Sequence, residues 1–197
     1  MPIDRSSPTP EQPDEVARYP LLDALLARRS QRFGQGRTLN GGPLAYTSGH
    51  TPQPLSLAEE AALAFAACGI TGYALAELPY HTGAAPEAGG GHIMTQFIGR
   101  TVASADAVHA VSLVVLNDAG TWLLKRPQDY PRGAIAPLIQ AARAHRFVEL
   151  YEQSRVRLAP ARLDVPRTLP FVPPFNKWVA NQPGSTYFLP VAVTRER

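Results

Sequence analysis

Apolar residues recur at helical spacing soon after the first twenty residues. A helix is expected to begin near Tyr19, because Pro20 suits an early helical position and four leucines then form one stripe. These leucines are Leu21, Leu22, Leu25 and Leu26. The pattern predicts a first helix that ends in the basic turn 28–32.

The second helix has the clearest start signal in the chain. Ser56 and Glu59 form an S-x-x-E capping box, in which each side chain satisfies a backbone N–H at the helix start. The helix is predicted to run through Leu57 to Cys68, with Gly69 as its C-terminal cap. Its residues are nearly all small or apolar, so we expect it to be buried.

The second half of the chain alternates strand and helix signals. Two apolar runs, 111–116 and 122–124, flank an N-D-x-G turn and predict a β-hairpin. A third helix is expected from Ile135 to Ser154, and a strand from Phe188 to Val193. The segment from Leu78 to Gly91 is rich in turn residues and is predicted to be a loop.

Ser104 can cap a short helix that runs to His109. With the hairpin and the longer helices, these elements predict an α+β fold in which a central antiparallel or mixed sheet is flanked by helices.

The distribution of proline predicts the domain boundaries. Of the 197 residues, 20 are proline. Residues 1–18 are expected to form a flexible polar lead-in. Residues 19–158 are expected to form the folded domain. After Leu158 the prolines are mixed with aromatic residues, so 159–197 is expected to be an ordered arm that packs on the domain or on a partner.

Composition narrows the class of protein. Hydrophobic residues make up 45% of the chain, which is enough to build a core and argues against overall disorder. The single cysteine, Cys68, excludes an intrachain disulfide and is expected to be a small core residue. No apolar run is long enough to span a membrane and no secretory signal is present, so a cytoplasmic protein without membrane contact is expected.

Of the 19 basic residues, 17 are arginine, but they are scattered among acids and the formal net charge is +3. Nucleic-acid binding usually needs a clustered basic face, so it is not expected here. The histidines lack paired metal-ligand spacing, and His145 is expected to be a solvated surface residue. No metal site is predicted.

One candidate for chemistry is the basic turn after the first helix. Arg28, Arg29 and Arg32 with Ser30 place three guanidinium groups and a hydroxyl within about a turn and a half. A phosphate group is a natural partner for such a cluster, through bidentate charge-assisted bonds. A solvated basic helix end, which complements the helix dipole, is the alternative interpretation.

Three motifs in order resemble the flavin-dependent nitroreductase superfamily. The turn R-R-S-Q-R-F at 28–33 is similar to the R-R-S-x-R-x-F opening of that family. Residues 55–72, which end in G-I-T-G, resemble its buried central helix, as seen in the branch with thiazoline-oxidising dehydrogenases. Residues 99–104 resemble the segment that leads into its P-S-S-x-N-x-Q flavin motif. The resemblance covers roughly Tyr19 to Arg126.

The resemblance implies an intertwined homodimer with FMN at the subunit interface. Hydride would pass from NAD(P)H through FMN to a nitro, quinone, enone or azoline acceptor, with no catalytic side chain assigned. Arg28, Arg29, Ser30 and Arg32 would hold the FMN phosphate and ribityl chain, and Ser104 would lie near the flavin ring. The family's asparagine, which contacts the flavin ring, corresponds to Ala107 of this chain, and the glutamine of the same motif corresponds to His109.

The family also continues with strands and contacts that this sequence does not show after residue 190. The chain is therefore expected to be a fragment, one part of a split protein, or a degenerate member of the family. A second hypothesis follows: the chain is a non-catalytic module that binds or assembles with a partner chain, which would complete the fold.

Overall fold

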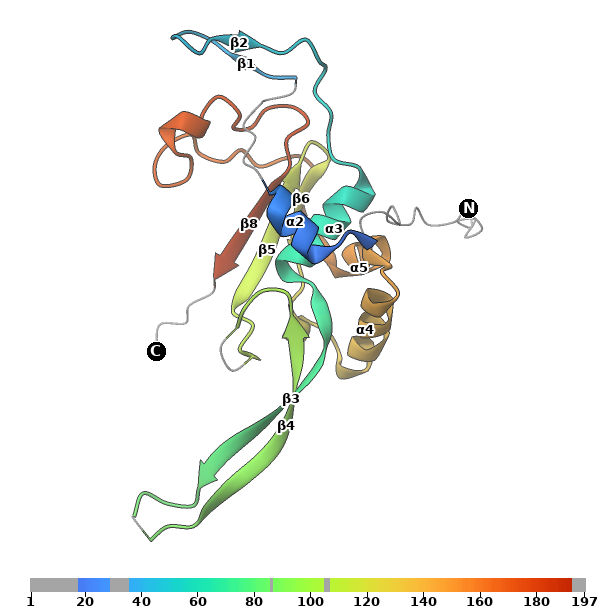
Figure 1. Cartoon of the computed structure of the whole chain (residues 1–197), viewed down its shortest axis with the longest axis vertical. Helices are drawn as coiled ribbons and strands as arrows, with labels where there is room; N and C mark the ends of the chain where they lie inside the picture. Colours follow the sequence, from blue (N-terminus) through green and yellow to red (C-terminus); the bar gives the residue numbers. More distant parts are fainter. Residues whose placement is uncertain (1–17, 29–35, 86, 105–106, 193–197) are drawn as a thin grey trace.

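The computed structural model describes residues 18–28, 36–85, 87–104 and 107–192. At its centre is a four-stranded antiparallel sheet with strand order β7-β6-β5-β8 (Figure 1). Its strands are β5 Val111–Asn117, β6 Gly120–Leu124, β7 Arg155–Ala159 and β8 Tyr187–Ala192. The predicted hairpin over 111–124 and the predicted strand near Phe188 are confirmed. Strands and helices together confirm the α+β class.

Helices α3 and α5 pack against this sheet and against each other (Figure 1). The helices of the described chain are α2 Leu21–Ala27, α3 Leu57–Cys68, α4 Ile135–Arg143 and α5 Phe147–Ser154. The described residues also form the short 3-10 helices η2 Pro127–Asp129, η3 Arg132–Ala134 and η4 Pro174–Asn176. The main core combines α3 and α5 residues with Leu113, Val115 and Leu124 of the sheet. Apolar burial between these elements is the main source of their stability.

The capping box at the start of α3 is confirmed. The Glu59 amide donates to Ser56 Oγ at 3.2 Å, and the Ser56 amide donates to Glu59 Oε2 at 2.8 Å. Gly69 caps the other end, where its amide donates to the Phe65 carbonyl at 2.7 Å. Burial of α3 is confined to one face, because Ala61 and Ala64 face the core while Leu63 is 47% exposed. The prediction of a helix buried on most sides was therefore wrong.

The predicted helix from Ile135 to Ser154 is two helices. The chain breaks between α4 and α5, where His145 has a left-handed φ of 55°. The break is stabilised by the Arg146 amide, which donates to the Ala141 carbonyl at 2.9 Å. Bending here lets α4 cover β3 while α5 packs on α3, which one straight helix could not do. His145 is exposed, as predicted.

A long hairpin replaces the loop predicted over Leu78–Gly91. Its strands, β3 Ile70–His81 and β4 Gly90–Arg100, pair in antiparallel register from Gly72↔Gly99 to His81↔Gly90. The hairpin projects from the body of the molecule (Figure 1). Pro79 and the glycines of 89–91 favour a turn locally, but they lie at positions of the two-stranded ladder that tolerate them. A separate small hairpin pairs β1 Thr38–Leu39 with β2 Tyr46–Thr47.

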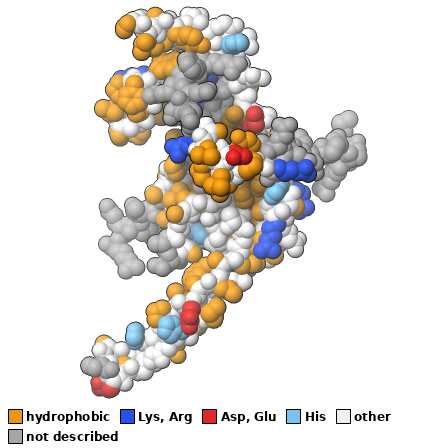
Figure 2. Space-filling view, viewed as in Figure 1, with side chains coloured by type: hydrophobic (Ala, Val, Ile, Leu, Met, Phe, Trp, Pro, Cys, Tyr) orange, Lys and Arg blue, Asp and Glu red, His pale blue; other side chains and the backbone are white. Residues whose placement is uncertain are grey.

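Helix α2 is shorter than predicted and lies on the surface. It ends at Ala27, and Arg28 is its C-cap residue. Its four leucines are 59–73% exposed and gather on one face of the molecule (Figure 2). The remainder of the predicted basic turn, Arg29, Ser30 and Arg32, lies outside the described residues.

The segment between β7 and β8 is irregular but packed. Val165, Val172 and Ala180 form a small buried cluster against Tyr187 and Leu189 of β8. The Asn181 side chain bonds both the amide and the carbonyl of Val165, at 3.0 and 2.9 Å. The segment therefore joins the fold through its own core and through the pairing of β8 with β5. In the described residues, no helix has the length and apolar character needed to cross a membrane.

A buried carboxylate connects three elements of the fold. Glu60 of α3 is 4% exposed, and its Oε1 accepts from the Tyr151 hydroxyl of α5 at 2.6 Å. Its Oε2 accepts from the Asn117 side-chain amide of β5 at 2.7 Å. Burial and the neighbouring Glu60 carboxylate raise the pKa of Tyr151, so the phenol stays protonated and donates. Both carboxylate oxygens are thus satisfied inside the core.

The variant Tyr151→Phe is expected to lower the free energy of unfolding by about 1–3 kcal/mol, because Glu60 Oε1 then stays buried without its donor. Denaturant unfolding measures this change. The control Tyr73→Phe removes the hydroxyl of a 46% exposed side chain and is expected to change stability by less than about 0.5 kcal/mol. Equal stabilities of the two variants would contradict a stabilising role for the Glu60–Tyr151 bond.

Candidate functional site

Of the two described site residues predicted from the sequence, Ser104 lines a groove and Arg28 does not. Arg28 is exposed at the end of α2. Ser104 lies in the loop between β4 and β5, where it lines an open groove of about 370 Å³. Arg28 is not among the residues that line this groove. Of the short helix predicted over 104–109, Ala107 has a 3-10 conformation and His109 lies outside any helix; both have left-handed φ values.

The groove has an apolar side and a polar end. One face of the β3–β4 hairpin supplies the apolar side through Ala74, Ala76, Leu78 and Phe97. The polar end is formed by Arg100, Ser104 and His109. The same three residues also line an adjoining hollow of about 280 Å³, so they lie between the two spaces. This arrangement suits a flat ligand with an apolar body and a polar or anionic edge.

Arg100 is held rigidly at the end of β4. Its Nε donates to the Cys68 carbonyl at 3.1 Å, and its Nη1 donates to the Val111 carbonyl at 2.9 Å. Its Nη2 is buried and has no hydrogen-bond partner among the described residues. Burial lowers the pKa of Arg100, but a guanidinium stays charged at any physiological pH. Arg100 therefore offers a fixed, unused donor on a positive charge.

His109 is the second unsatisfied group of the polar end. Its side chain is 8% exposed, and Nδ1 has no partner in the described structure. Burial lowers the pKa of His109, the Arg100 charge lowers it further, and a hydrogen bond with the Ile98 backbone partly offsets both. The imidazole is therefore neutral at neutral pH. Unpartnered buried polar atoms are rare in folded proteins, and here two of them belong to residues that line one groove, which makes the groove the candidate site.

The loop that carries these groups has an uncommon backbone. Ala107 and His109 have φ values of 52° and 53°, a region that non-glycine residues enter at a cost of about 1–2 kcal/mol. The loop is fixed by the His109 amide, which donates to Ser104 Oγ at 2.9 Å. The Gln128 side chain also donates to the His109 carbonyl at 3.2 Å. Strained backbone held by specific bonds is concentrated at functional sites.

Reasoning from the sequence found Ser104 but missed Arg100 and His109 as groove residues. Arg100 is the single charged residue at the end of an apolar strand, and this position was the available signal. His109 aligned with the family's glutamine, but its burial could not be predicted, because it depends on the β4 backbone that comes to lie against it. The described residues hold no cluster of His, Cys, Asp and Glu that could bind a metal ion.

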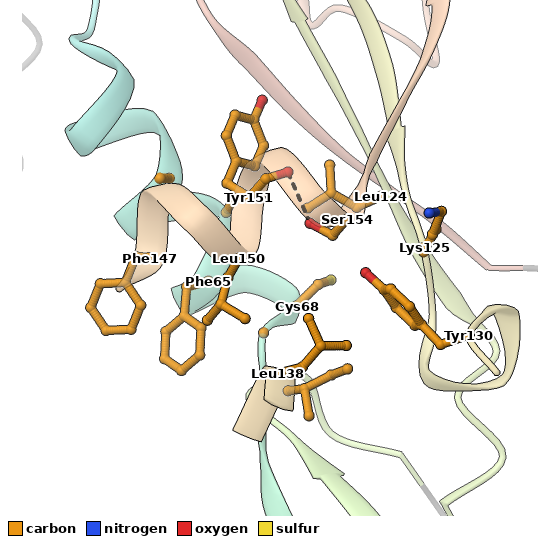
Figure 3. Close-up of a pocket in the computed structure, with 14 residues that line it drawn as sticks. Phe65, Cys68, Leu124, Lys125, Tyr130, Leu138, Phe147, Leu150, Tyr151 and Ser154 are labelled. Atoms are coloured by element: carbon orange, nitrogen blue, oxygen red, sulfur yellow. Dashed lines mark hydrogen bonds between the residues drawn. The ribbon is translucent and has the colours of Figure 1, made fainter. Parts of the chain in front are cut away.

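A second cavity, of about 40 Å³, lies inside the core between α3, α5 and β6 (Figure 3). Phe65, Cys68, Leu138 and Tyr151 are among the mostly apolar residues that line it. Burial raises the pKa of the Cys68 thiol and raises that of Tyr130 to about 12. Both groups are therefore protonated at neutral pH, and Cys68 is not present as a thiolate. The cavity is a packing gap with room for little more than water.

The state of His109 makes stability depend on pH. Because its folded pKa is depressed, its contribution is complete above the unfolded value of about 6.5 and is lost as pH falls towards the folded pKa. We expect the free energy of unfolding to fall below pH 6.5 more steeply in the native protein than in His109→Asn. Asparagine also tolerates the left-handed backbone.

The matched control is His145→Asn, which changes an exposed histidine with a similar φ of 55°. This variant is expected to keep the native pH dependence. Denaturant unfolding at a series of pH values measures all three proteins. Parallel curves for the native protein and His109→Asn would contradict the depressed pKa of His109.

No family model matches the chain, and neither the curated proteins nor the solved structures contain a significant match to it. Function is therefore inferred from the groove and from the motifs in the sequence.

Proposed function

We propose that this chain binds FMN and belongs to a nitroreductase-type oxidoreductase. Hydride would pass from NAD(P)H to a nitro, quinone, enone or azoline acceptor. The observation that supports this function is that Ser104 lines one groove with Arg100 and His109, and each of those two residues has a buried side-chain nitrogen without a partner among the described residues. Ser104 belongs to the motif that the resemblance places near the flavin ring.

The residues of the groove fit the flavin chemically. Its apolar side contains the small side chains of Ala74 and Ala76, which leave room for a flat ring. Arg100 Nη2 is a fixed donor, and a flavin carries carbonyl oxygens along one edge that need donors. His109 offers a ring nitrogen at the position where the family has a glutamine. Ala107 offers no polar atom where the family has asparagine.

Arg28, Arg29, Ser30 and Arg32 would hold the phosphate and ribityl chain. When bound, FMN supplies the hydride chemistry, and the protein orients it and tunes its surroundings. The part assigned to this chain is binding: Arg100 and Ser104 would offer donors to the ring, and the hairpin face would exclude water from one side. Because Arg100 is anchored by two carbonyls, its free donor needs little reorganisation on binding.

A second candidate function is a partner-dependent binding module without catalysis. The exposed leucines of α2, each at least 59% exposed, favour it, because such a stripe is normally covered. Flavin uptake separates the two functions. A module without catalysis would take up no FMN, yet it would form a complex with a partner chain.

The FMN proposal predicts two separable losses of affinity. Ser104→Ala should weaken FMN and riboflavin alike by about 5–10-fold, because a ring contact worth about 1 kcal/mol is lost. Arg28→Ala should weaken FMN by more than about 10-fold and leave riboflavin unchanged, because riboflavin has no phosphate to bind a guanidinium. Quenching of flavin fluorescence on titration measures each dissociation constant.

Thr101→Ala serves as the control for the hydroxyl deletion. Thr101 Oγ1 donates to the Phe65 carbonyl at 2.8 Å and does not line the groove, so flavin affinity should be unchanged. A native protein that takes up no FMN from solution would overturn the proposal. Equal effects of Arg28→Ala on FMN and riboflavin would overturn the phosphate assignment alone.

A further inference from the structure

The β3–β4 hairpin exposes many apolar side chains for a structure with two strands. Figure 2 shows apolar side chains at several points along the projecting hairpin. The exposed ones are Tyr73, Leu75, Leu78, Tyr80, Ile93 and Met94, each between 38% and 68% exposed. A two-stranded hairpin is marginally stable in water unless further strands or a helix cover it. Helix α4 covers only its base, through Ile70 and Ile98.

The hydrogen bonds of the hairpin determine which backbone groups point outwards. At the tip, the Thr82 amide donates to the Gly89 carbonyl at 2.8 Å, so this pair is hydrogen-bonded. Bonded and non-bonded pairs alternate along an antiparallel ladder, and the register is unbroken from 72 to 81. The pairs Pro79–His92, Glu77–Met94 and Leu75–Gln96 are therefore non-bonded. Their backbone groups face the two outer edges of the hairpin.

The two edges differ in their capacity to accept another strand. On the β3 edge, Pro79 stands at an outward position and has no N–H to donate, which interrupts any added strand. On the β4 edge, His92, Met94 and Gln96 present complete backbone groups. The residues from 90 to 98 also include no Lys, Arg, Asp or Glu that would discourage pairing. Further along, His109 lies against the Ile98 backbone and limits the open stretch.

We propose that a second copy of this chain pairs with the β4 edge, antiparallel and about a two-fold axis at Met94. This inference is independent of flavin binding. With the axis there, Met94 pairs with Met94 of the partner subunit and His92 pairs with Gln96 of the partner subunit. All are outward positions, so each pair exchanges both of its backbone hydrogen bonds.

The side chains of β4 complement one another in this register. On the opposite face from Met94, Ile93 lies beside Thr95 of the partner subunit, and Gly91 lies opposite Phe97 of the partner subunit. An aromatic side chain across from a glycine covers the exposed backbone that glycine leaves. The polar pair of His92 and Gln96 can hydrogen-bond across the strands. No like charges meet, so self-pairing meets no electrostatic penalty.

The blocked β3 edge makes this assembly closed. Two hairpins joined through β4 form a four-stranded sheet whose outer edges are both β3, each interrupted by Pro79. Isologous pairing through one open edge gives a dimer rather than a fibre. The contact is smaller than a standard interface of about 800 Å² per partner, so the dimer should dissociate in the micromolar range.

Disulfide trapping tests the register. In a bonded pair the two Cα atoms lie about 5.5 Å apart, which is within the range for a disulfide. Met94→Cys should therefore form a covalent dimer under mild oxidation, about tenfold or more faster than Thr95→Cys, whose two copies are offset along the strands. The native Cys68 is buried and does not compete. Equal crosslinking of the two variants, or none in either, would overturn the proposed axis.

Proline substitutions test the edge itself in the full chain. Met94→Pro removes an outward N–H and should abolish this association, measured as a loss of mass in sedimentation equilibrium. Leu75→Pro makes the same change on the β3 edge and should leave the association native. Pro79→Thr should open the β3 edge and give assemblies larger than a dimer. A native protein without concentration-dependent mass, or Met94→Pro with native mass, would overturn the proposal.

Discussion

The close approach of α3 to the central sheet is the constraint on which the rest of the structure depends. Ala61 and Ala64 are 1% and 2% exposed, and their small side chains let the helix lie near β5. The Glu60 carboxylate then fixes the helix in register through α5 and β5. Since α3 leads directly into β3, its position also decides where the long hairpin leaves the body. The Cys68 carbonyl at its end orients the Arg100 guanidinium.

Local signals in the sequence were sufficient where one or two neighbouring residues decide the structure. The Ser56–Glu59 box and the turn after Asn117 are such cases, and both were predicted correctly. The break at His145 and the strands around Pro79 depend on distant contacts, with α3 and with the opposite strand, so composition misled there. The residues of the groove also divide into those that local sequence signals predict and those that depend on distant contacts. Ser104 was predicted from a motif, whereas the unpaired atoms of Arg100 and His109 exist only once β4 and the following loop have met.

The β3–β4 hairpin contributes one surface to the groove and a different surface to the proposed strand pairing. One of its faces forms the apolar side of the groove, and its β4 edge carries unpaired backbone between His92 and Gln96. His109 stands where the two meet, against the Ile98 backbone and at the polar end of the groove. A conformational change in the loop that carries His109 would therefore alter both the groove and the β4 edge. Flavin binding and strand pairing, although proposed on separate grounds, share this one residue as a neighbour.

The position of β8 has a consequence for how the chain folds. Strand β5 pairs with β6 through a tight turn, but its other side pairs Leu116 with Tyr187, far along the sequence. Contacts between residues so distant in sequence slow folding, because the intervening chain must first be ordered. During synthesis, the backbone groups of β5 that pair with β8 remain unpaired until β8 has left the ribosome. In that interval the nascent chain is most exposed to misassociation and to the chaperones that prevent it.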